Sequence, residues 1–222
     1  MKRNATEPSA LDQRASDLVQ RLLSVGIDGK GPFDGAAEVA RAARKDHPTT
    51  ESAVHAVVRK HSRLIAGNGF LTGVGGLATL AVALPANVFG FYVLTVRAVG
   101  AIAELRGYDT RTPEVRSAVL LTLVGSDATE VLKSAGLPAG GFVTGRLTGL
   151  LTSRAPEPVL MLLNKGVGFR LIARFGTTGL LRVPTRALPL VGGVVGAGVD
   201  AMLFRRIAKS AEHALPPRAV ES

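Results

Sequence analysis

The chain has 222 residues, no cysteine and no tryptophan, and a formal net charge of +10 at pH 7. The absence of cysteine excludes a disulfide framework, a thiolate metal site and a cysteine nucleophile, and it fits a reducing cytoplasm. Aromatic residues make up only 5% of the chain, so we expect an aliphatic, helical interior. The polar residues that follow Met1 give no sign of a secretory signal.

The first sixty residues are predicted to form a front piece of short helices, preceded by a flexible segment over residues 1–8. Aliphatic side chains recur there with helical spacing between start and stop signals. The signals are Ser9 with Asp12 as a start, Gly26 as a stop, Asp34 as a second cap, and Pro48 followed by a start at Thr49 or Thr50.

Residues 64–96 contain no charged residue, a run of 33 that is long enough to cross a bilayer as one helix. Pro85 lies in this run and favours a break, so we expect two helical arms that fold back as a hairpin. Basic residues flank both arms, which would place both ends on the cytoplasmic side. These residues are Arg59, Lys60 and Arg63 before the run, and Arg97, Arg106 and Arg111 in or after the second arm.

Downstream, the pattern again predicts helices, and no stretch shows the alternation of a strand. Gly107 is an expected helix stop, and Thr112-Pro113-Glu114 is a start. A short helix is expected from Ser126-Asp127 to Gly136, followed by helices over 138–152, 157–175 and 188–213. The fold class predicted is a single all-α domain over residues 9–213, built around the apolar hairpin, with a flexible tail over 214–222.

The positive charge is concentrated in residues 131–199, which hold eight basic residues against Glu157 alone. An anionic lipid surface or a phosphate-bearing polymer would be attracted to such a segment, and a solvated basic face is the simpler alternative.

Three pairs of glycines four residues apart each leave one helix face without side chains. Helices can pack closely at such faces, in a membrane or in a soluble core, and packing is the inference we draw. The pairs are Gly69 with Gly73, Gly145 with Gly149, and Gly192 with Gly196. Neither glycine-rich run fits a nucleotide-binding loop, because the residues that must accompany one are missing.

Charged residues inside the apolar part form a candidate polar cluster. Arg97 and Glu104 are seven residues apart on one expected helix face, Asp109 follows, and Arg116 is expected to join from the next helix. An ion network that locks the helices is one interpretation, and a polar-ligand or lipid-headgroup site is the other. Asp200, after thirteen uncharged residues, has the same two interpretations.

A metal site is not expected. Glu51, His55 and His61 are near one another in sequence, but the two histidines fall on different helix faces and no metalloprotease motif accompanies them. No cofactor is predicted.

The middle of the chain resembles the EcsC family. The resemblance covers residues 50–210 and is carried by Gly69 to Gly76, by Leu84-Pro85, by Arg97 through Gly107-Tyr108-Asp109, and by the glycine-rich run after Pro189-Leu190-Val191. It implies a helical bacterial protein without an agreed activity, in an accessory role near an ABC transporter, and it supplies no catalytic residues.

The sequence therefore favours a non-enzymatic, cytoplasmic protein, peripheral or re-entrant at the membrane, with an anionic lipid surface or a membrane protein as partner. One alternative is a soluble carrier of lipid or another apolar ligand. Another is an enzyme that uses Glu104 and Asp109 beside Arg97 and Arg116. Nucleic-acid binding is not expected, because aromatic residues are sparse and no recognition motif is present.

Overall fold

The computed structural model describes residues 9–30, 33–74, 80–137, 155–178 and 189–218. Every regular element in these ranges is a helix, which confirms the predicted all-α fold class. Only the backbone is described for residues 68–74, 80–86, 175–178 and 189–196. The elements are α1 (Ala10–Gly26), α2 (Ala36–Asp46), α3 (Thr50–Val74), α4 (Leu80–Leu105), α5 (Pro113–Val124), the 3-10 turn η2 (Gly125–Asp127), α6 (Ala128–Ser134), α9 (Glu157–Thr178) and α10 (Pro189–Ala214).

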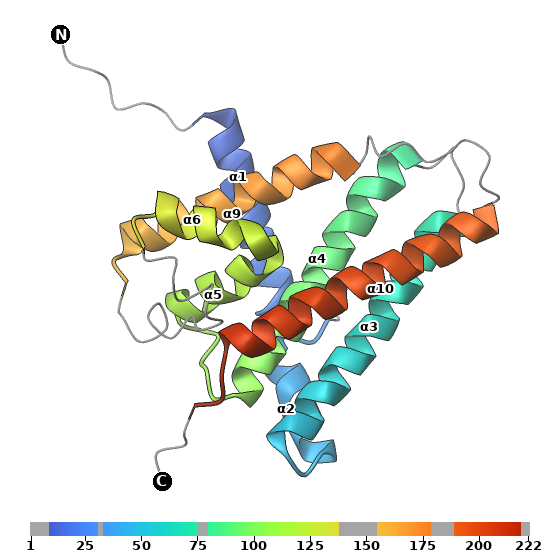
Figure 1. The fold of residues 1–222 in the computed structure, drawn as a ribbon, viewed down its shortest axis with the longest axis horizontal. Coiled ribbons are helices and arrows are strands. Elements are labelled where there is room, and N and C mark those ends of the chain that lie inside the picture. The colour runs from blue at the N-terminus through green and yellow to red at the C-terminus, as the bar shows by residue number, and fades with distance from the viewer. Residues whose placement is uncertain (1–8, 31–32, 75–79, 138–154, 179–188, 219–222) are drawn as a thin grey trace.

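The central helix is α4, which packs against α1, α2, α3, α5 and α10. Figure 1 shows α3 and α4 running in opposite directions as the expected hairpin, with α10 crossing beside α3 on one side. On the other side, α1, α5 and α6 pack with α9. The hairpin therefore organises a single domain, with α10 as its third long helix.

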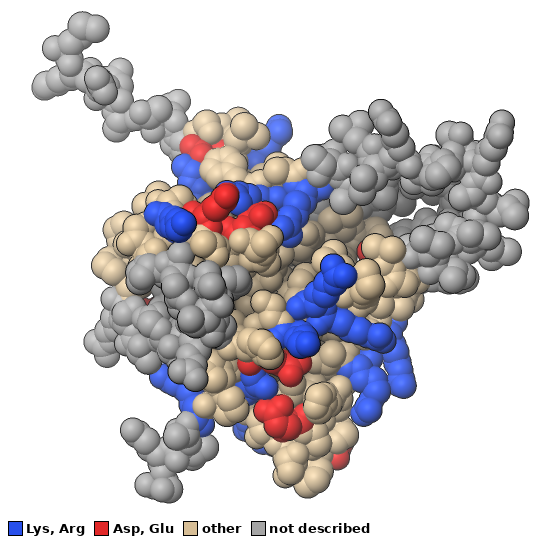
Figure 2. Space-filling model, in the orientation of Figure 1, with Lys and Arg blue, Asp and Glu red and all other residues tan. Residues whose placement is uncertain are grey.

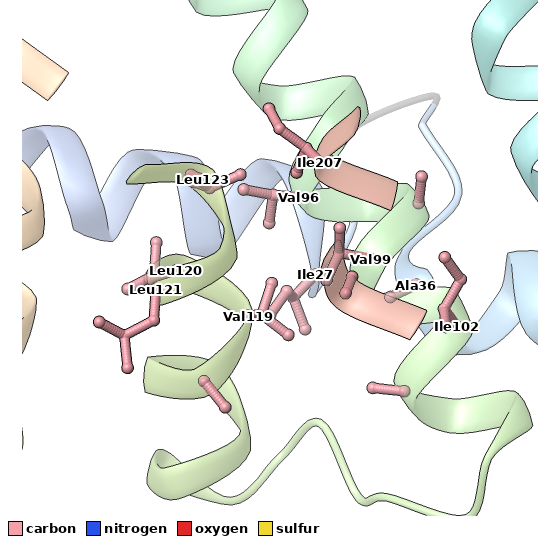
Figure 3. Packing of buried hydrophobic residues seen from close by; sticks show 14 of the residues in the cluster. Ile27, Ala36, Val96, Val99, Ile102, Val119, Leu120, Leu121, Leu123 and Ile207 are labelled. Carbon is pink, nitrogen blue, oxygen red and sulfur yellow. The ribbon is translucent and has the colours of Figure 1, made fainter. Parts of the chain in front are cut away.

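The core is aliphatic and is centred on the second half of α4. Val96, Val99 and Ile102 are fully buried and face Val119 of α5 and Ile27 after α1, as Figure 3 shows. Fully burying one such side chain stabilises the fold by about 1.5–3 kcal/mol. The second half of α4 is therefore covered by other parts of the protein.

Close helix approach occurs at glycines that the spacing argument did not identify. A Cβ on Gly100 would lie 2.8 Å from the Ala36 Cβ, and one on Gly168 would lie 2.5 Å from the Ala15 carbonyl oxygen. Alanine would therefore clash at both positions. The predicted pairs are not tested: Gly145 and Gly149 fall outside the described residues, as do the surroundings of Gly69, Gly73, Gly192 and Gly196.

Most predicted helix boundaries in the described residues are confirmed and two are wrong, while the helix expected over 138–152 lies outside the described residues. Ser9 and Asp12 form the expected capping box of α1. Asp34 does not cap α2, because Gly35 occupies the N-cap position and no side chain bonds there. Pro85 does not separate the two arms, since it lies in the second turn of α4, where its missing N–H removes only one hydrogen bond near a helix end. The arms separate between Val74 and Leu80.

The C-terminal residues differ from expectation. We expected 214–222 to be a flexible tail, but Ala214 and Leu215 are buried. The Tyr108 hydroxyl donates to the Pro216 carbonyl at 2.7 Å, and the Arg218 guanidinium lies 5.2 Å from the centre of the Tyr108 ring. Residues 214–218 are thus docked against the end of α4.

Candidate functional site

The predicted polar cluster does not assemble as one site. No ion pair joins Arg97 to Glu104 in the described part of the chain. Seven residues of helix separate them by roughly 10 Å along the axis, and each meets different neighbours. Arg97 lies under the ring of Phe33, with 5.5 Å between the guanidinium carbon and the ring centre.

Glu104 and Arg116 are joined only indirectly, because both bond to Thr110 in the loop between α4 and α5. The Glu104 carboxylate accepts hydrogen bonds from the backbone N–H and the hydroxyl of Thr110, and Arg116 Nε donates to the Thr110 carbonyl at 3.0 Å. Arg116 also pairs with Asp28. This arrangement fastens the loop to the end of α1, which agrees with the interpretation of these charges as a structural lock.

Asp109 and Asp200 lie apart from that lock. Asp109 is paired with the exposed Arg111 at 2.9 Å, and hydrogen bonds from Arg111 hold the pKa of this carboxyl below its usual value. On α10, burial raises the pKa of Asp200, and a hydrogen bond from Asn87 of α4 partly offsets the rise. The carboxylates of Glu104 and Asp109 therefore have separate partners.

Arg106 is a structural residue that the sequence argument missed. Its buried guanidinium bonds to the Glu51 carboxylate at 3.1 Å and to the Leu215 carbonyl at 2.9 Å, and it also bonds to the Glu212 carbonyl. It thereby joins the start of α3, the end of α4 and the end of α10. No group of three or more metal-ligating side chains occurs among the described residues.

A surface across α3 and α10 is the second candidate. Exposed cations follow the same i, i+1, i+4 spacing on both helices, and Figure 2 shows Lys and Arg side chains gathered over this part. None of these cations forms a salt bridge with a described carboxylate. We call this set the basic collar: Arg59, Lys60 and Arg63 on α3, with Arg205, Arg206 and Lys209 on α10.

Next to the basic collar, large aliphatic side chains are exposed. We call them the apolar shoulder: Leu64 (45% exposed), Val199 (53%), Met202 (51%) and Leu203 (41%). Toward the neighbouring ends of α3, α4 and α10, residues 64–74, 80–96 and 189–199 carry no charge in the sequence. Figure 1 shows these three ends on the right of the view, away from α5 and α6. The exposed side chains of α3 and α10 thus change from the cations of the basic collar to the aliphatic residues of the apolar shoulder.

One helical stretch, Asn87–Leu105, is long and apolar enough to cross a membrane by composition, among the residues the structure describes. In the most apolar part of this stretch, 72% is buried inside the protein. A core helix passes the same test, and the contacts of α4 identify this stretch as core.

Most of the described cations in the predicted basic segment, residues 131–199, form salt bridges. Lys165 pairs with Asp12 at 2.8 Å, Arg170 with Glu130 at 2.7 Å, and Arg174 with Asp127 at 3.0 Å. Lys133 is exposed, and Arg146, Arg154, Arg182 and Arg186 lie outside the described residues. The six cations of the basic collar, in contrast, are all exposed and form no salt bridge with a described carboxylate.

A groove lies between α1 and α9, with a volume of about 640 Å³. Its walls are largely apolar and include Val19, Leu23, Met161 and Leu162, with Lys165 at one side.

The residues together define a class of protein, an all-helical domain with a basic and apolar face on two antiparallel helices. No family model matches the chain, and neither a curated protein nor a solved structure is significantly similar to it.

Proposed function

We propose that the protein is a non-enzymatic accessory protein that binds the cytoplasmic face of an anionic membrane through α3 and α10. The observation that carries the proposal is the apolar shoulder bordered by the basic collar. Soluble surfaces seldom place several large exposed aliphatic side chains together, and cations beside them are typical of helices that lie in a lipid interface.

The two parts of this surface would act at different depths. The apolar shoulder would enter the boundary between headgroups and acyl chains, and the basic collar would remain among the phosphates. Each cation near an anionic surface contributes about 1 kcal/mol, and burying aliphatic surface contributes about 25 cal/mol per Å². The attachment is peripheral, because the most apolar stretch of α4 is enclosed by other helices.

The resemblance to the EcsC family supports an accessory role and adds a membrane protein, such as an ABC transporter, as a partner. In this proposal the membrane surface positions the protein beside that partner.

Co-sedimentation with vesicles tests the proposal on the full chain. We expect binding to vesicles that contain phosphatidylglycerol, weaker binding to pure phosphatidylcholine, and a decline as salt is raised. Met202→Glu should reduce binding at least tenfold. The matched control is Met161→Glu, which places the same change at a methionine that is 64% exposed on α9. Equal binding by wild type and Met202→Glu would refute the proposal.

A second candidate function, carriage of a lipid or another apolar ligand, is favoured by the groove between α1 and α9. Its volume is within the range of small-molecule sites. Native mass spectrometry of gently purified protein should then show a bound lipid, and Leu23→Glu should remove it. A ligand-free mass for the wild-type protein would reject this function.

A further inference from the structure

Two arginines are buried, Arg97 in α4 and Arg106 directly after it, and only Arg106 has polar partners among the described residues. Arg97 and Arg106 are each 7% exposed, and the Nε of each has no hydrogen bond. The terminal nitrogens of Arg106 bond to Glu51 and to the Leu215 carbonyl. Arg97 has no hydrogen bond or ion pair with any described residue. Of these two buried cations, Arg106 is thus paired through its terminal nitrogens, whereas Arg97 has no direct polar partner among the described residues.

The surroundings of Arg97 do not neutralise its charge. The Phe33 ring lies over the guanidinium, and Asp34 acts on it electrostatically without forming an ion pair. His61 lies near on α3, but burial lowers its pKa to about 4, so it is neutral at pH 7. A ring face offsets less than the loss of hydration of a buried guanidinium. No described anion is therefore in direct contact with the guanidinium.

We propose that Arg97 anchors an oxyanion site, in which its guanidinium binds the phosphate group of a ligand beneath Phe33. The planar fork of an arginine matches phosphate oxygens in a bidentate manner. The chain's charge of +10 also attracts multivalent anions. The Phe33 side chain is 56% exposed, so moving this one ring would open the site to solvent. The phosphate could belong to a lipid headgroup or to a soluble compound.

This site is distinct from the basic collar, because Arg97 projects from α4 beneath the α1–α2 loop while the collar lies on α3 and α10. The two proposals can consequently fail separately.

Arginine side-chain NMR of the full wild-type chain provides the direct test. Inorganic phosphate is titrated against sodium chloride at equal ionic strength. We expect the Nε–H signal of Arg97 to shift in a saturable manner, while that of Arg106 stays in place because its terminal nitrogens are occupied. An Arg97 signal that does not move, or that moves in parallel with all arginine signals, would overturn the proposal for soluble phosphate.

A second titration uses phosphatidylglycerol vesicles as the source of phosphate. A selective Arg97 shift with vesicles alone assigns the site to a headgroup, and a shift with inorganic phosphate assigns it to a soluble compound. No selective shift with either source overturns the proposal.

Thermal denaturation of variants gives an independent measure. The source that shifts the Arg97 signal should raise the wild-type Tm, and Arg97→Met should abolish this rise. Arg97→Lys keeps the charge but loses the fork, and it should weaken the apparent affinity at least tenfold. Arg41→Gln, at a highly exposed arginine of α2 outside the basic collar, is the matched control and should keep the full rise. A rise in Tm that is retained in Arg97→Met would contradict the proposal. If Arg97→Met does not fold, an undiminished apparent affinity in Arg97→Lys would contradict it instead.

Discussion

The Nε of Arg205 on α10 donates a hydrogen bond to the Oγ of Ser62 on α3 at 3.2 Å. Ser62 is buried and Arg205 is exposed, so the bond fixes the base of one collar cation to the neighbouring helix. Because α3 and α10 are antiparallel, this contact also places the two cation sets at the same height. The collar is therefore a property of the helix pair rather than of either helix alone.

Removing the acceptor should loosen this contact without unfolding the protein. We expect Ser62→Ala to lower the free energy of unfolding by about 1 kcal/mol, since Arg205 can hydrate its guanidinium. Binding to phosphatidylglycerol vesicles should weaken only a few-fold. Urea denaturation and co-sedimentation measure the two effects, and a loss of vesicle binding as large as that of Met202→Glu would contradict this account of Ser62.

Arg106 should be among the most sensitive positions for stability. Arg106→Met removes the partner of the Leu215 and Glu212 carbonyls and of Glu51, so we expect a loss of about 3 kcal/mol or more in the free energy of unfolding. Glu51→Gln should cost less than about 1 kcal/mol, because that carboxylate is half exposed. Arg111→Met, at a highly exposed arginine, is the control for urea denaturation. Similar losses for Arg106→Met and Arg111→Met would disprove the locking role.

His61 should make the fold sensitive to mild acid. Burial lowers its pKa from 6.5 to about 4, while its Nδ1 bonds to the Val57 carbonyl at 2.9 Å. The unfolded chain therefore binds this proton more tightly than the folded chain. Stability should fall as the pH is lowered from 6.5 through 4, by about 3 kcal/mol from this group.

Urea denaturation at several pH values measures this slope. His61→Asn should flatten the slope between pH 7 and 4.5, whereas the control His55→Gln, at an exposed position on the same helix, should not. An unchanged slope in His61→Asn would rule out the assignment.

Asp200 should be a position where a lost charge stabilises the protein. Its pKa is raised by burial between α10 and α4, and Asn87 only partly offsets this effect. The raised pKa means that the folded state disfavours the ionised form, so stability falls as the pH rises through the ordinary value of 3.8 toward the folded value. Asp200→Asn should then raise Tm at pH 7 and strengthen binding to phosphatidylglycerol vesicles. A lower Tm for this variant would show that the carboxylate is needed.

Helix positions were predictable because the signals are local. Capping by Ser9 with Asp12, the Pro113 start and the positive φ of Gly107 and Gly136 need no tertiary knowledge. The misplaced break at Pro85 shows the limit of such rules, since a proline early in a helix costs little.

The partners of the charged residues could not be predicted in the same way. Arg97 and Glu104 share a helix face, but the loops that cover them decide their neighbours, and loop positions depend on the whole fold. The sequence does contain a signal for the basic collar that the predictions did not use. The matching i, i+1, i+4 spacing of cations in α3 and α10 is visible in the sequence, and only the antiparallel pairing of the two helices joins them.

The depth of single fluorescent labels at the lipid surface tests the central proposal most directly. The chain has no cysteine, so Met202→Cys and Met161→Cys each create one site for an environment-sensitive dye such as NBD. With phosphatidylglycerol vesicles, the label at position 202 should shift to the blue and brighten while the label at 161 stays unchanged. A label at position 202 that remains in a watery environment after vesicles are added would contradict the account.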